Sequence, residues 1–248
     1  MNTNPVWHES LNVFFGEGHG YAAYFYMLII LAPIEFFSLY LPSLDLQMWS
    51  GSASLFKVCA VTSLLLIAYF TLRVANQEFA PWRFQTIKRW IREQGQSVRT
   101  VAQAQLGFLT LHVFVSIFLC SPFLIWAAAI ARTSPGSVAG TFLLFFFYSL
   151  SYGVWGLVTL VLWERRAESR QVFIRCFFFA LVIGSALMYL PLNPVAFLLA
   201  YLGRQELSPL KLLGTTWPAT SVHFAFHFLL GGTGLAAYAW ALKRQVAL

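Results

Sequence analysis

Apolar and polar residues alternate along this chain in long blocks. Six apolar blocks, each of about twenty residues or slightly more, are separated by segments that hold nearly all of the charged residues. The hydrocarbon core of a bilayer is roughly 30 Å thick, and an α-helix of about 20 residues crosses it. The pattern therefore predicts six transmembrane helices, at residues 21–41, 55–74, 105–131, 138–163, 172–190 and 219–242.

The composition agrees with a membrane protein. Hydrophobic residues make up 59% of the chain and charged residues only 10%. A water-soluble core of this size would not bury so much apolar surface. We therefore predict an all-α, polytopic membrane protein, in which residues 21–248 form one six-span domain. The three cysteines fall within or at the ends of spans, which favours packing roles over disulfides or a metal motif.

The basic residues indicate an orientation. Twelve of the sixteen Lys and Arg residues lie between spans two and three, between spans four and five, after span six, or within the span ends next to these segments, and only four lie toward the other side. Lys and Arg prefer the cytoplasmic side of a membrane. Both termini are therefore expected in the cytoplasm. This bias also accounts for the net charge of +7, so no nucleic-acid partner is expected.

Three segments outside the spans are each predicted to contain a further helix. Residues 1–20 contain Asn4-Pro5, a helix-start signal followed by apolar residues at helical spacing, which predicts an amphipathic interfacial helix. Residues 77–100 form the only sizeable cytoplasmic segment and predict a basic amphipathic helix. That helix would either float on anionic lipid or serve as a docking lever for a soluble partner. Residues 191–218 lie outside and predict a re-entrant or surface helix after Pro194.

Polar residues within the spans are the candidates for chemistry. His223 and His227 are four residues apart and share a helix face, and His112 lies in span three. Paired histidines would ligate a membrane haem only if they faced each other at one depth, and these depths match poorly. Interhelical hydrogen bonds are the favoured interpretation. Glu35 is the one acid well inside a span, and structural or path-lining use is favoured over proton transfer. Its carboxyl group would either pair with Lys57 or be protonated.

Several sequence signals of catalysis are missing. The chain has no phosphate-binding Gly-rich loop that ends in Lys-Ser or Lys-Thr, no His-Glu-x-x-His, and no Ser nucleophile elbow. An enzyme is therefore not expected. ATP would not bind to this chain in the manner of a P-loop protein.

The order of its motifs resembles the membrane subunit of type-2 ABC transporters, whose ATPase is a separate polypeptide. The matching elements, in chain order, are Asn4-Pro5-Val6-Trp7 with Glu9, Glu78 followed by residues 81–100, Ser121-Pro122-Phe123, and Asn193-Pro194-Val195. The chain departs from the family pattern in its Trp- and Arg-rich first loop and in lacking Gly-Gly after span three.

The resemblance implies an exporter permease in a bacterial inner (cytoplasmic) membrane, which pairs with a second permease. ATP and Mg²⁺ would be bound by the separate ATPase subunits, and this chain would carry no cofactor. The residues expected to couple to the ATPase are Glu78, Arg83, Ile87, Trp90, Ile91, Arg92, Glu164 and Arg165. The alternative is a haem-bearing or structural membrane subunit of a larger redox complex.

Overall fold

A computed structural model describes residues 4–38, 52–212 and 214–247. Six helices in it are long and apolar enough to cross a membrane, and each coincides with a predicted span. Of the described residues, 82% are helical, so the predicted fold class of a multi-pass helical protein is confirmed. Residues 1–3 of the predicted interfacial segment and 39–41 of the first predicted span lie outside the described residues.

The elements are, in chain order, α1 (Pro5–Leu11), η1 (Asn12–Gly16), α2 (His19–Ser38), α3 (Ser52–Ala75), η3 (Arg89–Glu93), α4 (Val98–Ile130), α5 (Pro135–Leu162), α6 (Ala167–Phe179), η4 (Ala180–Gly184), α7 (Ser185–Met188), η5 (Leu190–Leu192), α8 (Pro194–Gly203), β1 (Leu210–Leu212), β2 (Thr215–Trp217) and α9 (Ala219–Ala247). α6, η4 and α7 together form the fifth span. β1 and β2 pair as an antiparallel hairpin that the apolar pattern did not predict.

α5 is the central helix of the bundle. It packs against α3, α4 and α9, and its second half, from Tyr148 to Val161, is almost wholly buried. Glycines allow the closest approach: a Cβ on Gly156 would lie 2.6 Å from the carbonyl oxygen of Leu72 in α3. By contrast, α2, α7 and α9 expose large apolar side chains such as Phe37, Leu187 and Phe228. In a bilayer these faces meet lipid, so their exposure is expected.

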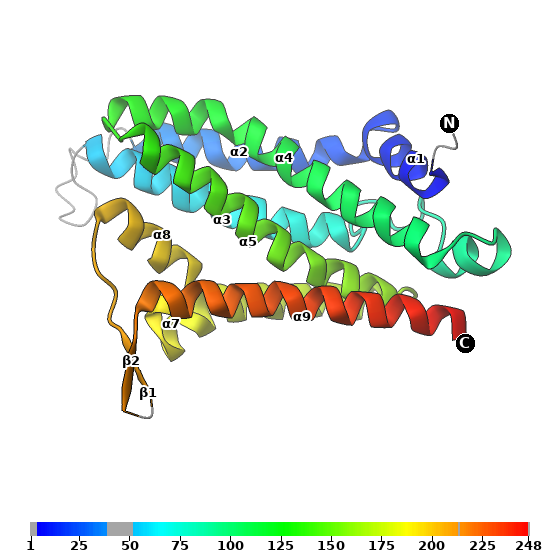
Figure 1. Ribbon diagram of the computed structural model, residues 1–248. Helices are drawn as coiled ribbons and strands as arrows, with labels where there is room; N and C mark the ends of the chain where they lie inside the picture. The colour runs from blue at the N-terminus through cyan, green and yellow to red at the C-terminus, as the bar shows by residue number, and fades with distance from the viewer. Residues whose placement is uncertain (1–3, 39–51, 213, 248) are drawn as a thin grey trace.

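The N-terminal helix forms as its sequence predicts. The side chain of Asn4 accepts hydrogen bonds from the backbone N–H groups of Val6 and Trp7, and Pro5 takes the first helical position. α1 packs on α4, where Trp7 lies against Gly107. Both ends of the chain lie at one end of the bundle (Figure 1).

The segment between spans two and three differs from its prediction. The prediction of an amphipathic helix across residues 77–100 is wrong. Residues 81–83 form turns, only residues 87–93 are helical, and α4 already begins at Val98. Gly95, with φ +64°, ends the short helix. This left-handed conformation is easily adopted only by glycine. We call residues 77–97 the connecting segment.

The chain turns back sharply after the fifth span. α7 ends at Met188, Tyr189 is extended, and the short η5 turn leads into α8. Asn193 caps α8 by accepting the N–H of Ala196, and its amide nitrogen donates to the carbonyl oxygen of Val182 and to the Ser185 hydroxyl. This one side chain therefore fixes the start of α8 to the end of the fifth span. α8 packs against α3 and α5.

Candidate functional site

Two carboxylates hold the connecting segment against the end of the bundle. Glu9 of α1 accepts the backbone N–H of Gln85 at 2.9 Å and the indole N–H of Trp90 at 3.2 Å. Glu164, just after α5, accepts the N–H of Ile87 at 2.5 Å. Burial raises the pKa of both carboxyls above the ordinary value, against the opposing effect of these hydrogen bonds.

Further bonds join the same region to other helices. Arg73 at the end of α3 forms an ion pair with Glu78 at 2.9 Å. The Arg92 guanidinium donates from Nε to the carbonyl oxygen of Gln245 in α9, at 3.1 Å. The connecting segment is thereby tied to the ends of α1, α3, α5 and α9, so a displacement of the segment would be passed to four helices at once.

The residues predicted to couple to a partner divide into three groups by their exposure. Ile87 and Trp90 are only 2% and 5% exposed, so their side chains pack inside the protein and cannot meet a partner directly. The exposed members are Arg83, Arg92 and Arg165, whereas Ile91, Glu78 and Glu164 are partly buried. The segment thus presents a basic outer surface.

Trp82 is a candidate contact that the sequence analysis did not identify. Its side chain is 72% exposed at the turn before the short helix. Arg83 beside it approaches Glu17 at 3.5 Å in an exposed ion pair, which is a weak restraint. The available signal was Pro81, because Pro marks a turn as well as a helix start, and a turn there places Trp82 outside the helical stripe.

The two histidines of α9 face two tyrosines of α5. The Tyr148 hydroxyl lies 2.5 Å from Nε2 of His223, and the Tyr152 hydroxyl lies 3.2 Å from Nδ1 of His227. Both imidazoles are fully buried. Their other nitrogens meet backbone oxygens of η5, Nδ1 of His223 at 2.6 Å from Pro191 and Nε2 of His227 at 3.1 Å from Leu192.

These contacts determine which nitrogen of each imidazole carries the hydrogen. A carbonyl oxygen only accepts, so Nδ1 of His223 and Nε2 of His227 carry hydrogens. In neutral rings the remaining nitrogens then accept from the tyrosine hydroxyls. All four ring nitrogens are therefore engaged with protein groups. The pair fastens the break between the fifth span and α8 to α9, as the interpretation of interhelical hydrogen bonding predicts.

His112 belongs to a separate cluster. Its Nδ1 lies 3.0 Å from the Tyr24 hydroxyl of α2, and Phe14 packs edge-on against its ring. None of these side chains is among the ring or hydrogen-bond contacts of His223 or His227 in the described part of the chain. The histidines thus form no facing pair of the kind that a bis-histidine haem requires.

Glu35 is buried between helices without a conventional partner. It is 2% exposed, and no nitrogen or oxygen atom of the described residues hydrogen-bonds to either carboxylate oxygen, although the Cys59 thiol is close enough to donate. Its neighbours are the Cys59 and Cys120 thiols. The ion pair with Lys57 is absent from the described structure, because the Lys57 ammonium lies by α8, 3.6 Å from the position of a Cβ on Gly203.

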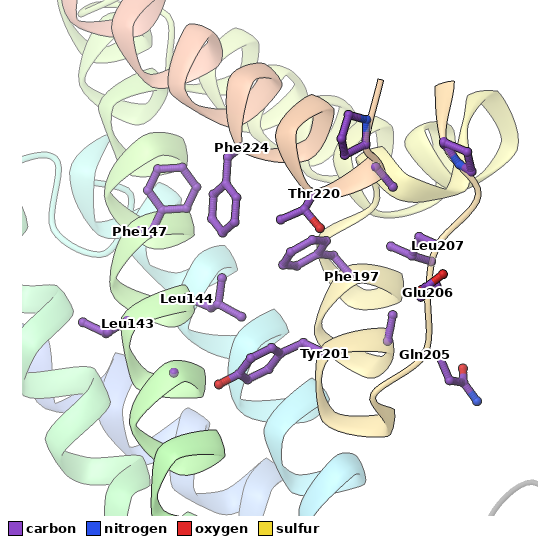
Figure 2. A pocket seen from close by; sticks show the side chains of 15 residues that line it. Leu143, Leu144, Phe147, Phe197, Tyr201, Gln205, Glu206, Leu207, Thr220 and Phe224 are labelled. Carbon is purple, nitrogen blue, oxygen red and sulfur yellow. The ribbon is translucent and has the colours of Figure 1, made fainter. Parts of the chain in front are cut away.

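A cavity of about 790 Å³ lies between α5, α8 and the start of α9. Figure 2 shows the rings of Phe147, Phe224 and Phe197 turned toward this space from the three helices. Tyr201 reaches across to α5, where its hydroxyl donates to the carbonyl oxygen of Gly136 and fills the place that a Cβ on Gly140 would take. The cavity therefore borders the same α8 that the histidines help to position.

In comparison with protein-family models, with curated proteins and with solved structures, the chain shows no match. The structure itself thus identifies three features: the fastened connecting segment at one end, the Tyr–His bonds near the other, and the cavity beside α8.

Proposed function

We propose that this chain is the membrane-spanning permease of an ATP-driven transporter whose ATPase is a separate polypeptide. The observation that supports this function is the attachment of the connecting segment to four helices by Glu9, Glu78, Glu164 and Arg92. An isolated surface helix would need no such attachment. A lever that receives force from a partner does need it, because loose attachment would dissipate the displacement.

The displacement has a physical route to the opposite end of the bundle. α5 and α9 run side by side and are joined by the Tyr148–His223 and Tyr152–His227 contacts. The same histidines hold η5 and so the start of α8. A shift of α5 against α9 at the connecting segment would change the position of α8. Small sliding movements of packed helices are a common way to switch between two states.

The finer assignments belong to this proposal. Both termini and the connecting segment face the cytoplasm of a bacterial inner membrane, in accordance with the placement of Lys and Arg. α8 is then a re-entrant helix on the outer side, stable at membrane depth because it is buried against α3 and α5. Two permeases face each other on two ATPase subunits, which bind ATP and Mg²⁺, and the direction of transport is export.

The test is purification of the tagged full-length chain in a mild detergent, with mass spectrometry of its partners. We expect a stoichiometric ATPase that contains a phosphate-binding loop. Co-purified cytochromes or redox subunits in its place would overturn the proposal and support a structural role in a redox complex.

Surface variants make the test specific. Trp82→Ala with Arg83→Glu changes only exposed positions of the connecting segment. We expect this variant to lose most of the ATPase while it retains membrane insertion. The matched control is Arg204→Glu, which reverses an exposed charge just after α8, at the end of the bundle opposite the connecting segment. This variant should leave ATPase recovery unchanged. Equal recovery in both variants would contradict the assigned docking face.

A further inference from the structure

The cavity beside α8 has walls of different chemistry at its two ends. Its apolar lining comes from α5, α8 and α9, with Leu144, Phe147 and Phe224 among the contributors. Its polar lining comes from the chain after α8, at Gln205 and Glu206. Figure 2 shows these two polar residues on the side away from Phe147 and Phe224. A ligand that fits both ends is an amphiphile with a hydrocarbon chain and a polar head.

We propose that this cavity binds one phospholipid of the surrounding bilayer, with an acyl chain between α5, α8 and α9 and an ammonium-bearing headgroup beside Glu206. Nothing in this proposal depends on the ATP-driven function. It concerns the full-length chain in a membrane, with or without a partner.

The depth of the cavity matches a lipid acyl chain from one leaflet of the bilayer. Its lining on α5 runs from Gly140 to Phe147, and these two residues are seven positions apart, or about 10 Å along the helix axis. That is about a third of the roughly 30 Å hydrocarbon core, so the cavity stays within a single leaflet. The polar residues at 205 and 206 then lie toward the end at which α5 begins, where a headgroup belongs.

The side of the cavity is open to the membrane. Leu143 of α5 lines it and is also 70% exposed. A leucine exposed on a transmembrane helix lies next to lipid. An acyl chain therefore enters laterally without crossing water, whereas a water-soluble ligand would first have to displace lipid from this opening. This is why we assign a bilayer phospholipid as the occupant.

The charges near the rim select the headgroup. Glu206 is exposed and takes part in no ion pair within 4 Å among the described residues. Arg204 is exposed two residues earlier, and the Lys57 ammonium lies close to Gly203. One carboxylate with cations nearby complements a headgroup that carries both an ammonium and a phosphate, as in phosphatidylethanolamine, better than a purely anionic one.

The experiment is photolabelling of the purified chain in nanodiscs. The probe is phosphatidylethanolamine with a diazirine on its acyl chain, and labelled peptides are located by mass spectrometry. We expect labels concentrated on peptides that contain residues 140–147, 197–207 and 219–224. Phosphatidylglycerol with the same diazirine chain should label them less, and Glu206→Gln should reduce the difference between the two lipids.

Two filling variants test the site from different helices. Ala200→Phe and Thr220→Phe each place a ring in the cavity lining. Each should lower labelling of the cavity peptides about tenfold, since excluding even two methylenes from an apolar site weakens binding by that order. The matched control is Leu187→Phe, at a position 83% exposed on α7 and outside the cavity lining. It should leave the labelling unchanged.

Folding is checked by gel filtration and circular dichroism, and having two filling variants keeps the test valid if one of them misfolds. The proposal is overturned if labels are spread over all lipid-facing helices in both the parent chain and the folded filling variants. It is also overturned if phosphatidylglycerol labels the cavity as strongly as phosphatidylethanolamine does.

Discussion

Replacing Glu9 by alanine tests whether the connecting segment is truly held by a carboxylate. The change removes the acceptor for the N–H of Gln85, at 2.9 Å, and for the indole N–H of Trp90, at 3.2 Å. Hydrogen bonds to a charged group contribute about 1.5–3 kcal/mol each. Because Glu9 is only partly buried, solvent screening reduces this, and we expect a loss of about 2 kcal/mol for the two bonds together.

The effect should be local opening of the segment. A loss of about 2 kcal/mol corresponds to roughly a 30-fold increase in the open population. Hydrogen–deuterium exchange of the chain in nanodiscs measures this directly, on peptides that cover residues 84–93. We expect faster exchange there and unchanged exchange in α3 and α5, whose core contacts the mutation does not touch.

The matched control is Glu93→Ala. Glu93 is also in the connecting segment, but it is exposed and forms only a long ion pair with Arg89 at 3.5 Å. Exposed pairs of this kind contribute about 0.3–0.5 kcal/mol. If Glu9→Ala and Glu93→Ala changed exchange equally, the carboxylate of Glu9 would not be what holds the segment, and the lever argument would lose its basis.

Three further predictions concern stability. Gly156→Ala should destabilise the chain by about 1–3 kcal/mol in a detergent unfolding assay, since its Cβ would meet a backbone oxygen of α3; Gly232→Ala, with open space around it, should not. Tyr148→Phe should cost about 1 kcal/mol, and clearly less in a His223→Leu background, as a double-mutant cycle would reveal. Glu164 has a raised pKa in the folded state. As pH falls, the Glu164 carboxylate is therefore protonated in the folded chain before it is protonated in the unfolded chain. Thermal stability should consequently rise from neutral pH toward the unfolded-state pKa of about 4.3. Glu164→Gln should flatten that rise, and an unchanged pH profile would contradict the burial argument.

The spans were predictable because the pattern that defines them is local. Twenty consecutive apolar residues have few alternatives to a membrane helix. The Asn4-Pro5 helix start also follows from single-residue preferences, and the structure confirms it. The hairpin β1–β2 was missed because its strands are three residues each, too short for an alternating pattern.

The candidate site was predictable only in part, because its bonds depend on tertiary contacts. The spacing of His223 and His227 correctly placed them on one helix face, but their partners lie 75 residues earlier in the chain, at Tyr148 and Tyr152. That constant offset is a signal of two parallel helices in matched register, although it can be recognised only once the helices are known to be neighbours. Likewise, Trp90 fits an amphipathic stripe equally well whether its apolar face meets lipid, a partner or the protein, and the structure turns it inward.

The hydrogen bonds to the break before α8 have a consequence for biogenesis. The carbonyl oxygens of Pro191 and Leu192 lie within hydrogen-bonding distance of imidazoles of α9, which is synthesised after α8. Until α9 has been inserted, these oxygens lack those partners, and an unsatisfied carbonyl in hydrocarbon is strongly unfavourable. A nascent chain that stops before residue 219 would therefore leave α8 without its final position. We therefore expect protease resistance of the 189–203 region to appear only after α9 has been synthesised and inserted.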